Sequence, residues 1–167
     1  MATVYSYILL DGALWQEDMD PARQAGASYR SLYRGKPAEE LGSVAPYLFL
    51  LSGNKSFEEW VNNRVQRDPE SRRVLRLEST LDIDELRRHL RRFLRVKTED
   101  GKWLLFRLYD PYVINCVIPN LSDVQFNSLF QGIACIITED GRINERRTFY
   151  LSPQGELIIA RKGIQIG

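Results

Sequence analysis

The sequence is poor in the residues that most often bind metals: among 167 residues it has one histidine and two cysteines. Structural zinc sites take four Cys or His ligands, often in pairs spaced as C-x-x-C. His89, Cys116 and Cys135 are scattered instead, so we expect neither a metal site nor a cofactor. Both cysteines lie in apolar stretches, which predicts buried free thiols in a reducing compartment.

Long apolar runs and a net charge are also missing. No run approaches the roughly 20 residues that cross a membrane, and the start, MATVYSYILLDGALW, lacks the basic region of a secretion signal. We therefore expect a cytoplasmic protein. With 23 basic and 22 acidic residues the net charge is +1, which argues against a dedicated nucleic-acid binder but leaves room for a local basic patch.

Motifs for phosphate binding and nucleophilic catalysis are absent too: there is no Walker pattern, no G-x-G-x-x-G and no G-x-S-x-G. His89 is more simply a solvated or flanking helix residue than a catalytic base. Asp11 and Asp110 each follow a predicted strand, where α/β proteins often place functional groups, so a divalent metal bound by these carboxylates stays an alternative. The commoner reading is that Asp11 stabilises a turn and Asp110 caps a helix.

Apolar periodicity predicts alternating strands and helices, followed by strands alone. Strands are expected at 4–10, 28–33, 47–51, 73–78 and 103–109, and helices at 57–67, 83–95, 111–117 and from 122 to about 130. Closely spaced strands at 133–138, 147–152 and 156–161 indicate an antiparallel meander. We predict one α/β (α+β) domain over 1–167, with a mixed central sheet flanked by helices in 1–132 and a C-terminal antiparallel β meander in 133–167.

Cap patterns support several of the helix starts. Three pairs have the spacing of a capping box: Ser56 with Glu59, Asp82 with Glu85, and Ser122 with Gln125. Two further N-termini are predicted where an aspartate precedes a proline, at Asp20-Pro21 and Asp110-Pro111.

Arginine is concentrated on the predicted helix 83–95. Arg87, Arg88, Arg91 and Arg92 lie beside or opposite its apolar stripe, and Arg95 follows them. A solvated basic face and a protein-binding face explain this density equally well. Because the four positions avoid the stripe, their replacement by glutamate is expected to leave the fold largely intact.

Several segments together resemble one known family. In order they are LLDGA (9–13), YRSLYRGKPAEEL (29–41), VAPYLFLL (44–51), a helix around Trp60, LRRHLRRFLRV (86–96), DGKWLLFRLYDPYV (100–113) and a proline-ended helix at Ile118-Pro119. This order is similar to that of the effector chaperones, or adaptors, of the bacterial type VI secretion system. FRLYDPYV resembles the family's F-R-x-Y-D-P-R signature, with Tyr112 where arginine is usual.

The resemblance implies a protein without catalytic activity. Such adaptors bind a cognate effector toxin and assist its loading onto the spike tip protein, VgrG, or its PAAR cap. Carried over by position, the signature places Arg107, Tyr109 and Asp110 among the candidate protein-binding residues, beside Arg87, Arg88, Arg91 and Arg92. Many members continue into a variable C-terminal lobe, whereas here only the predicted meander follows residue 132.

Two alternatives stay open at this point. One is an immunity-like inhibitor that blocks a toxin, and the other is a metal-dependent enzyme that uses Asp11 and Asp110. Neither a nucleic acid nor a membrane is expected as a partner, because the arginines are not interleaved with aromatic residues and no apolar run is long enough to span a bilayer.

Overall fold

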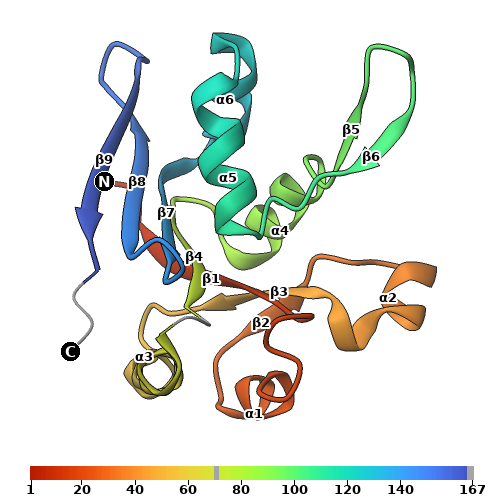
Figure 1. The fold of residues 1–167 in the computed structure, drawn as a ribbon, viewed down its shortest axis with the longest axis vertical. Helices are drawn as coiled ribbons and strands as arrows, with labels where there is room; N and C mark the ends of the chain where they lie inside the picture. The colour runs from red at the N-terminus through yellow and green to blue at the C-terminus, as the bar shows by residue number, and fades with distance from the viewer. Residues whose placement is uncertain (70–71, 165–167) are drawn as a thin grey trace.

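A seven-stranded sheet lies at the centre of the computed structural model, which describes residues 1–69 and 72–164 (Figure 1). The strand order is β2-β3-β1-β4-β7-β8-β9, and every pair of neighbours is antiparallel. The predicted α/β class with a C-terminal meander is confirmed, but the sheet is antiparallel throughout rather than mixed. Its strands are β1 (Tyr5–Asp11), β2 (Tyr29–Ser31), β3 (Pro46–Leu50), β4 (Arg73–Ser79), β7 (Ile133–Asp140), β8 (Glu145–Leu151) and β9 (Leu157–Gly163).

Helices cover both faces of this sheet, and a separate two-stranded hairpin projects from it (Figure 1). The helices are α1 (Met19–Gln24), α2 (Lys36–Glu40), α3 (Lys55–Arg67), α4 (Ile83–Arg91), α5 (Pro111–Val117) and α6 (Asp123–Leu129), with 3-10 turns η1 (Gly42–Val44) and η3 (Ile118–Asn120). The hairpin consists of β5 (Arg95–Lys97) and β6 (Trp103–Leu105). In the described ranges, no helix combines the length and the apolar character needed to cross a membrane.

Side-chain alternation along the central strands builds two separate apolar layers. Tyr7 and Leu9 of β1 belong to a cluster that includes residues of α4, α5 and α6, whereas Ile8 and Leu10 belong to a cluster with residues of α1 and α3. Successive strand residues point to opposite faces, so β1 and β3 must be apolar at consecutive positions. The continuous apolar run YLFLL is thereby explained.

Two of the three predicted capping boxes form. Asp82 accepts hydrogen bonds from the backbone N–H groups of Asp84 and Glu85, and the Glu85 side chain accepts one from the Asp82 N–H. Ser122 and Gln125 make the same reciprocal pair at α6.

The remaining starts are set by other residues. The box at Ser56 is wrong: the N-cap residue of α3 is Asn54, two residues earlier, and Asn54 Oδ1 accepts from the Phe57 N–H at 3.0 Å. The predicted start at Asp20 is wrong as well, since Asp18 is the N-cap residue of α1 and makes no side-chain cap bond. Asparagine is as good an N-cap residue as serine, because its side-chain oxygen also accepts from an unpaired N–H group of the first helical turn. Asn54 rather than Ser56 therefore sets the start of α3.

The clearest difference from the predicted elements lies between residues 91 and 109. Helix α4 ends at Arg91, where successive N–H groups bond three residues back, from Arg92 to His89 and from Phe93 to Leu90. This tighter winding keeps Leu94 on the buried side, so the apolar stripe continues past the helix end. The strand predicted over 103–109 stops at Leu105, after which the chain folds back towards α5.

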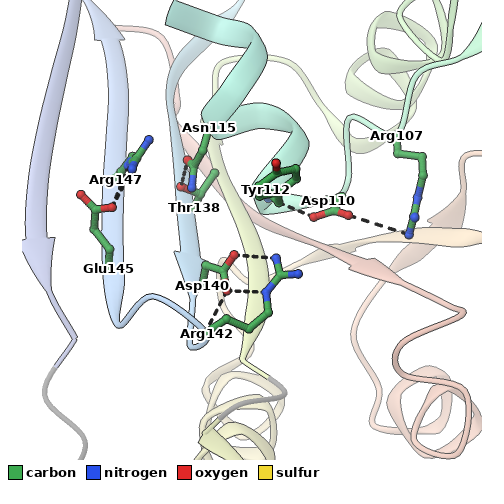
Figure 2. A network of polar contacts seen from close by, with 9 residues as sticks. All are labelled: Arg107, Asp110, Tyr112, Asn115, Thr138, Asp140, Arg142, Glu145 and Arg147. Carbon is green, nitrogen blue, oxygen red and sulfur yellow. Dashed lines mark hydrogen bonds and ion pairs between the residues drawn. The ribbon is translucent and has the colours of Figure 1, made fainter.

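The meander is tied to α5 by buried polar contacts, drawn in Figure 2. Thr138 Oγ1 donates to Asn115 Oδ1 at 2.7 Å, and both residues are buried. Asp140 holds Arg142 through both carboxylate oxygens, at 2.9 and 2.6 Å, and the Arg142 guanidinium lies 5.9 Å from the centre of the Tyr112 ring. The C-terminal strands are therefore anchored to the rest of the domain.

Candidate protein-binding surface

The two aspartates singled out in the sequence meet at one arginine. Arg107 Nη2 lies 2.8 Å from Asp11 Oδ2 and 3.9 Å from Asp110 Oδ2, although Asp11 and Arg107 are 96 residues apart (the contact with Asp110 appears in Figure 2). Asp11 also accepts from the Ala13 N–H at 3.0 Å, and Asp110 from the Tyr112 N–H at 2.9 Å. The turn and cap roles predicted for them are therefore both present.

This arrangement does not suit a divalent cation. The guanidinium of Arg107 already neutralises Asp11, and a second cation between the same carboxylates would meet a fixed positive charge. In the described parts of the chain, no group of three or more His, Cys, Asp or Glu side chains is placed to hold a metal ion.

The signature residues instead fix the base of the β5–β6 hairpin. Tyr109 is buried, its ring lies 5.7 Å from the Arg107 guanidinium, and burial is the main cause that raises the pKa of its hydroxyl. The Phe106 N–H donates to Leu94 O at 2.8 Å, closing the hairpin base. Arg107, Tyr109 and Asp110 thus connect the hairpin to the end of β1 and to the start of α5.

The hairpin itself exposes apolar side chains to solvent. Trp103, Leu104 and Leu105 are 63, 50 and 57 % exposed, and Val96 is 41 % exposed. The connecting turn is polar, with Gly101 in the left-handed conformation and a 2.9 Å ion pair between Lys102 and Asp100. A group of large exposed apolar side chains on a projecting element is typical of a surface that binds another molecule.

One groove lies between the hairpin and helices α5 and α6, with a volume of about 440 Å³. We name it the apolar groove, because its lining is almost entirely hydrophobic. The lining residues are Phe93, Val96, Phe106, Val117, Ile118, Leu121, Val124, Gln125, Ser128 and Leu129.

A second groove, of about 330 Å³, lies on the other side of the hairpin. We name it the arginine groove, because three arginines join its apolar lining. The lining residues are Leu32, Tyr33, Arg34, Pro37, Leu41, Arg91, Leu94, Arg95 and Leu105. Val96 contributes to the first groove and its neighbour Arg95 to the second, as expected for alternating residues of one strand, so the hairpin forms a wall between the two.

Arg87, Arg88 and Arg91 of α4, with Arg92 directly after it, do not form one solvated face. Arg87 donates to the carbonyl oxygens of Ser31 and Tyr33 at 2.6 and 3.2 Å. Replacing Arg87 by glutamate would remove both hydrogen bonds, so the structure gives this position a structural role that the sequence did not indicate. Arg92 contacts His89 Nδ1 at 3.0 Å, Arg91 lines the arginine groove, and Arg88 is exposed. The spacing of these arginines in the sequence does not indicate which of them contact the fold and which face solvent.

Residues 6–128 match a family model described as "Domain of unknown function (DUF4123)". The chain belongs to this family. The match extends from β1 into α6 and includes the hairpin and the whole arginine groove. No curated protein and no solved structure matches the chain.

Of the residues on this surface of the DUF4123 domain, Arg91 is among the candidates predicted from the sequence, whereas Trp103, Leu104 and Leu105 are not. The sequence predicts only a strand over 103–109 for them. The charged turn Glu99-Asp100-Gly101-Lys102 is followed by four consecutive apolar residues, Trp103 to Phe106. A continuous apolar run normally predicts a strand that is buried on both faces, so no local signal indicated that this one is exposed.

The two thiols and the single histidine differ in how far they are buried. Burial, with Glu78 nearby, raises the pKa of the Cys135 thiol to about 11, so it stays protonated at neutral pH. Cys116 is exposed, so the prediction that both thiols are buried is wrong for it. His89 is buried rather than solvated, and its Nε2 lies 2.7 Å from the Leu129 carbonyl oxygen. Because a carbonyl only accepts and Arg92 only donates, the ring is neutral with its proton on Nε2.

A pH dependence of stability follows from His89. Burial is the main cause that lowers its pKa from 6.5, so below about pH 6.5 the unfolded chain binds the proton more readily than the folded one. This contribution to stability is present above pH 6.5 and decreases as the pH falls. We expect the melting temperature of the wild type to fall more between about pH 7.5 and pH 5.5 than that of His89→Gln. Calorimetry at a series of pH values would measure this, and parallel curves for the two proteins would contradict it.

Proposed function

We propose that this DUF4123 protein is an adaptor of the type VI secretion system, which binds a cognate effector and assists its loading onto VgrG or its PAAR cap. Family membership and the order of the resembling segments support the choice of system. The observation that carries a binding role is the exposed apolar hairpin with a groove on each side. Tryptophan is among the residues that contribute most binding energy at protein interfaces, and Trp103 is the most exposed of the three apolar residues of β6.

We further propose that the protein works without catalysing a reaction. Arg107 occupies the space between the Asp11 and Asp110 carboxylates, and both ring nitrogens of His89 are engaged. The side chains of Asp11, Asp110 and His89 are thus already used in contacts within the fold. The work of the molecule would then be done by its surface, in the cytoplasm before secretion.

A capture experiment tests the adaptor function. The tagged protein is purified from cells that express their type VI genes, and co-purifying proteins are identified by mass spectrometry. We expect an effector and VgrG or a PAAR protein, and we expect the double substitution Trp103→Ser, Leu104→Ser to reduce both by about tenfold or more, because truncating one central anchor commonly costs about 2 kcal/mol.

The matched control is Ile143→Ser, which removes a similarly exposed apolar side chain from the turn between β7 and β8. It is expected to leave capture unchanged. Recovery of a toxin without any spike component, together with protection of cells from that toxin, would identify an immunity protein instead. Recovery of neither partner by the wild type would refute the adaptor function.

A further inference from the structure

The arginine groove has an unbalanced charge. Arg34, Arg91 and Arg95 line it, and no carboxylate does. None of the ion pairs formed among residues 1–69 and 72–164 includes any of the three. Elsewhere in the molecule arginines such as Arg107 and Arg142 hold carboxylates at hydrogen-bond distance, so the groove differs from the usual arrangement in this chain.

Among the three arginines of the groove, Arg91 is the one with a buried donor that lacks an acceptor. This donor is its Nη1 atom. Desolvation lowers the pKa of Arg91, and the neighbouring charges of Arg87 and Arg34 lower it further. The surroundings of Arg91 therefore destabilise the positive charge of its guanidinium. A buried donor without an acceptor costs stability, and a bound anion would remove that cost.

The rest of the groove is aliphatic. Leu32 and Leu94 are buried, whereas Leu41 and Leu105 are exposed at 47 and 57 %. A ligand that contacts both the arginines and the aliphatic residues of the groove needs a negative group directly beside an apolar one. A guanidinium can bind a carboxylate through two parallel hydrogen bonds, which suits an aspartate or glutamate side chain.

A nucleic acid fits this lining less well. Single-stranded nucleic acids need aromatic platforms on which bases stack, and Tyr33 is the one aromatic residue among those that line the groove. The near-neutral net charge also supplies no general attraction for a polyanion. Charge complementarity together with an aliphatic lining therefore favours a protein segment.

We propose that the arginine groove binds an acidic, apolar segment of a partner protein, in which an Asp or Glu side chain pairs with Arg91 and Arg34 and an adjacent aliphatic or aromatic side chain packs against Leu94 and Leu105. This assignment rests on the proposed adaptor function, and it names the chemistry of the segment that an effector or spike protein presents to the hairpin.

A random peptide library displayed on phage is the probe that tests it. Selection on the wild-type protein is expected to enrich peptides with Asp or Glu next to a large apolar residue, and selection on the Arg34→Gln, Arg91→Gln double variant is expected not to. The best peptide, labelled with fluorescein, should bind about tenfold more weakly when its acidic residue is changed to the amide. Its affinity should also fall when NaCl is raised from about 0.1 M to about 0.5 M.

The matched control is Arg67→Gln, which removes an exposed arginine at the end of α3, outside the groove lining. It is expected to leave peptide affinity unchanged. Peptides without acidic enrichment, or equal binding by the double variant, would overturn the proposal. So would competition by a single-stranded oligonucleotide at equal potency, or a dimer of the protein that dissociates in Arg91→Gln, since either names a different occupant.

Failure of this inference can be told apart from failure of the adaptor function. If the double variant still captures effector and spike proteins while the Trp103→Ser, Leu104→Ser variant loses them, the groove assignment is wrong and the adaptor function stands. If the wild type captures neither protein but still selects acidic peptides, the adaptor function is wrong and the chemistry of the groove stands.

Discussion

An alanine at Gly12 is expected to destabilise the protein by about 3 kcal/mol or more, one of the largest effects of any single methyl group in this chain. A Cβ atom at this position would lie 2.2 Å from Ala45 O and 2.8 Å from Val44 C, and both are backbone atoms. The Gly12 N–H donates to the same Ala45 oxygen at 3.1 Å. The end of β1 and the segment before β3 would have to separate, so buried strand pairing would be lost.

Urea unfolding followed by tryptophan fluorescence would measure this loss. Gly42→Ala is the control, since a Cβ there meets nothing within 4 Å and the residue does not occupy the left-handed region. We expect it to change the free energy of unfolding by about 0.5 kcal/mol or less. Equal stability of the two variants would show that the contact between β1 and the segment before β3 adapts more easily than its geometry indicates.

Replacing Glu139 by alanine is the second change with a large expected effect, about 3–4 kcal/mol. The Glu139 side chain is 4 % exposed and pairs with three arginines: Arg72 at 3.7 Å, Arg76 at 3.4 Å, and Arg146 through a short hydrogen bond. Arg72 and Arg76 are themselves largely covered. Without the carboxylate, the largely covered Arg72 and Arg76 would lose the acidic partner that they share with the half-exposed Arg146, and three positive charges would lie close together.

Chemical denaturation again provides the measurement. Glu58→Gln removes another carboxylate that pairs with Arg76, at 3.6 Å, but its side chain is 48 % exposed. It is expected to cost less than about 1 kcal/mol, since exposed ion pairs contribute little. In addition, Arg76→Leu should recover part of the loss in the Glu139→Ala background because it removes one of the unpaired charges. A similar small cost for both carboxylates would contradict a stabilising role for Glu139.

Cap pairs and apolar patterns predicted much of the fold, because the residues that form them are neighbours in the sequence and make the same contacts in the folded chain. The reciprocal cap of Asp82 with Glu85 depends only on neighbouring residues, and it forms as expected. The apolar run of β3 is buried on both faces, as its composition indicates. The antiparallel direction of the whole sheet, by contrast, depends on how long connections such as 12–45 run in space, which local patterns do not specify.

The binding surface was less predictable, because it depends on contacts between distant segments. Arg34, Arg91 and Leu105 come together only after β2, α4 and the hairpin have packed. The pairing of Asp11 with Arg107 spans 96 residues, and neither residue alone indicates the other. Periodicity also extended α4 past its true end, since a tight turn keeps Leu94 on the side where a helix would place it. The two strands of the exposed hairpin therefore fall within or beside a predicted helix, 83–95, and a predicted strand, 103–109, so the sequence did not predict a hairpin.

The hairpin has a consequence for how two ligands would influence one another. It is a two-stranded ribbon whose opposite faces border the two grooves. Among the described residues, no strand of the seven-stranded sheet pairs with β5 or β6. If a ligand in one groove tilts this ribbon so that its own groove widens, the other groove would narrow. Such a coupling would be reciprocal: each ligand would change the affinity for the other by the same factor.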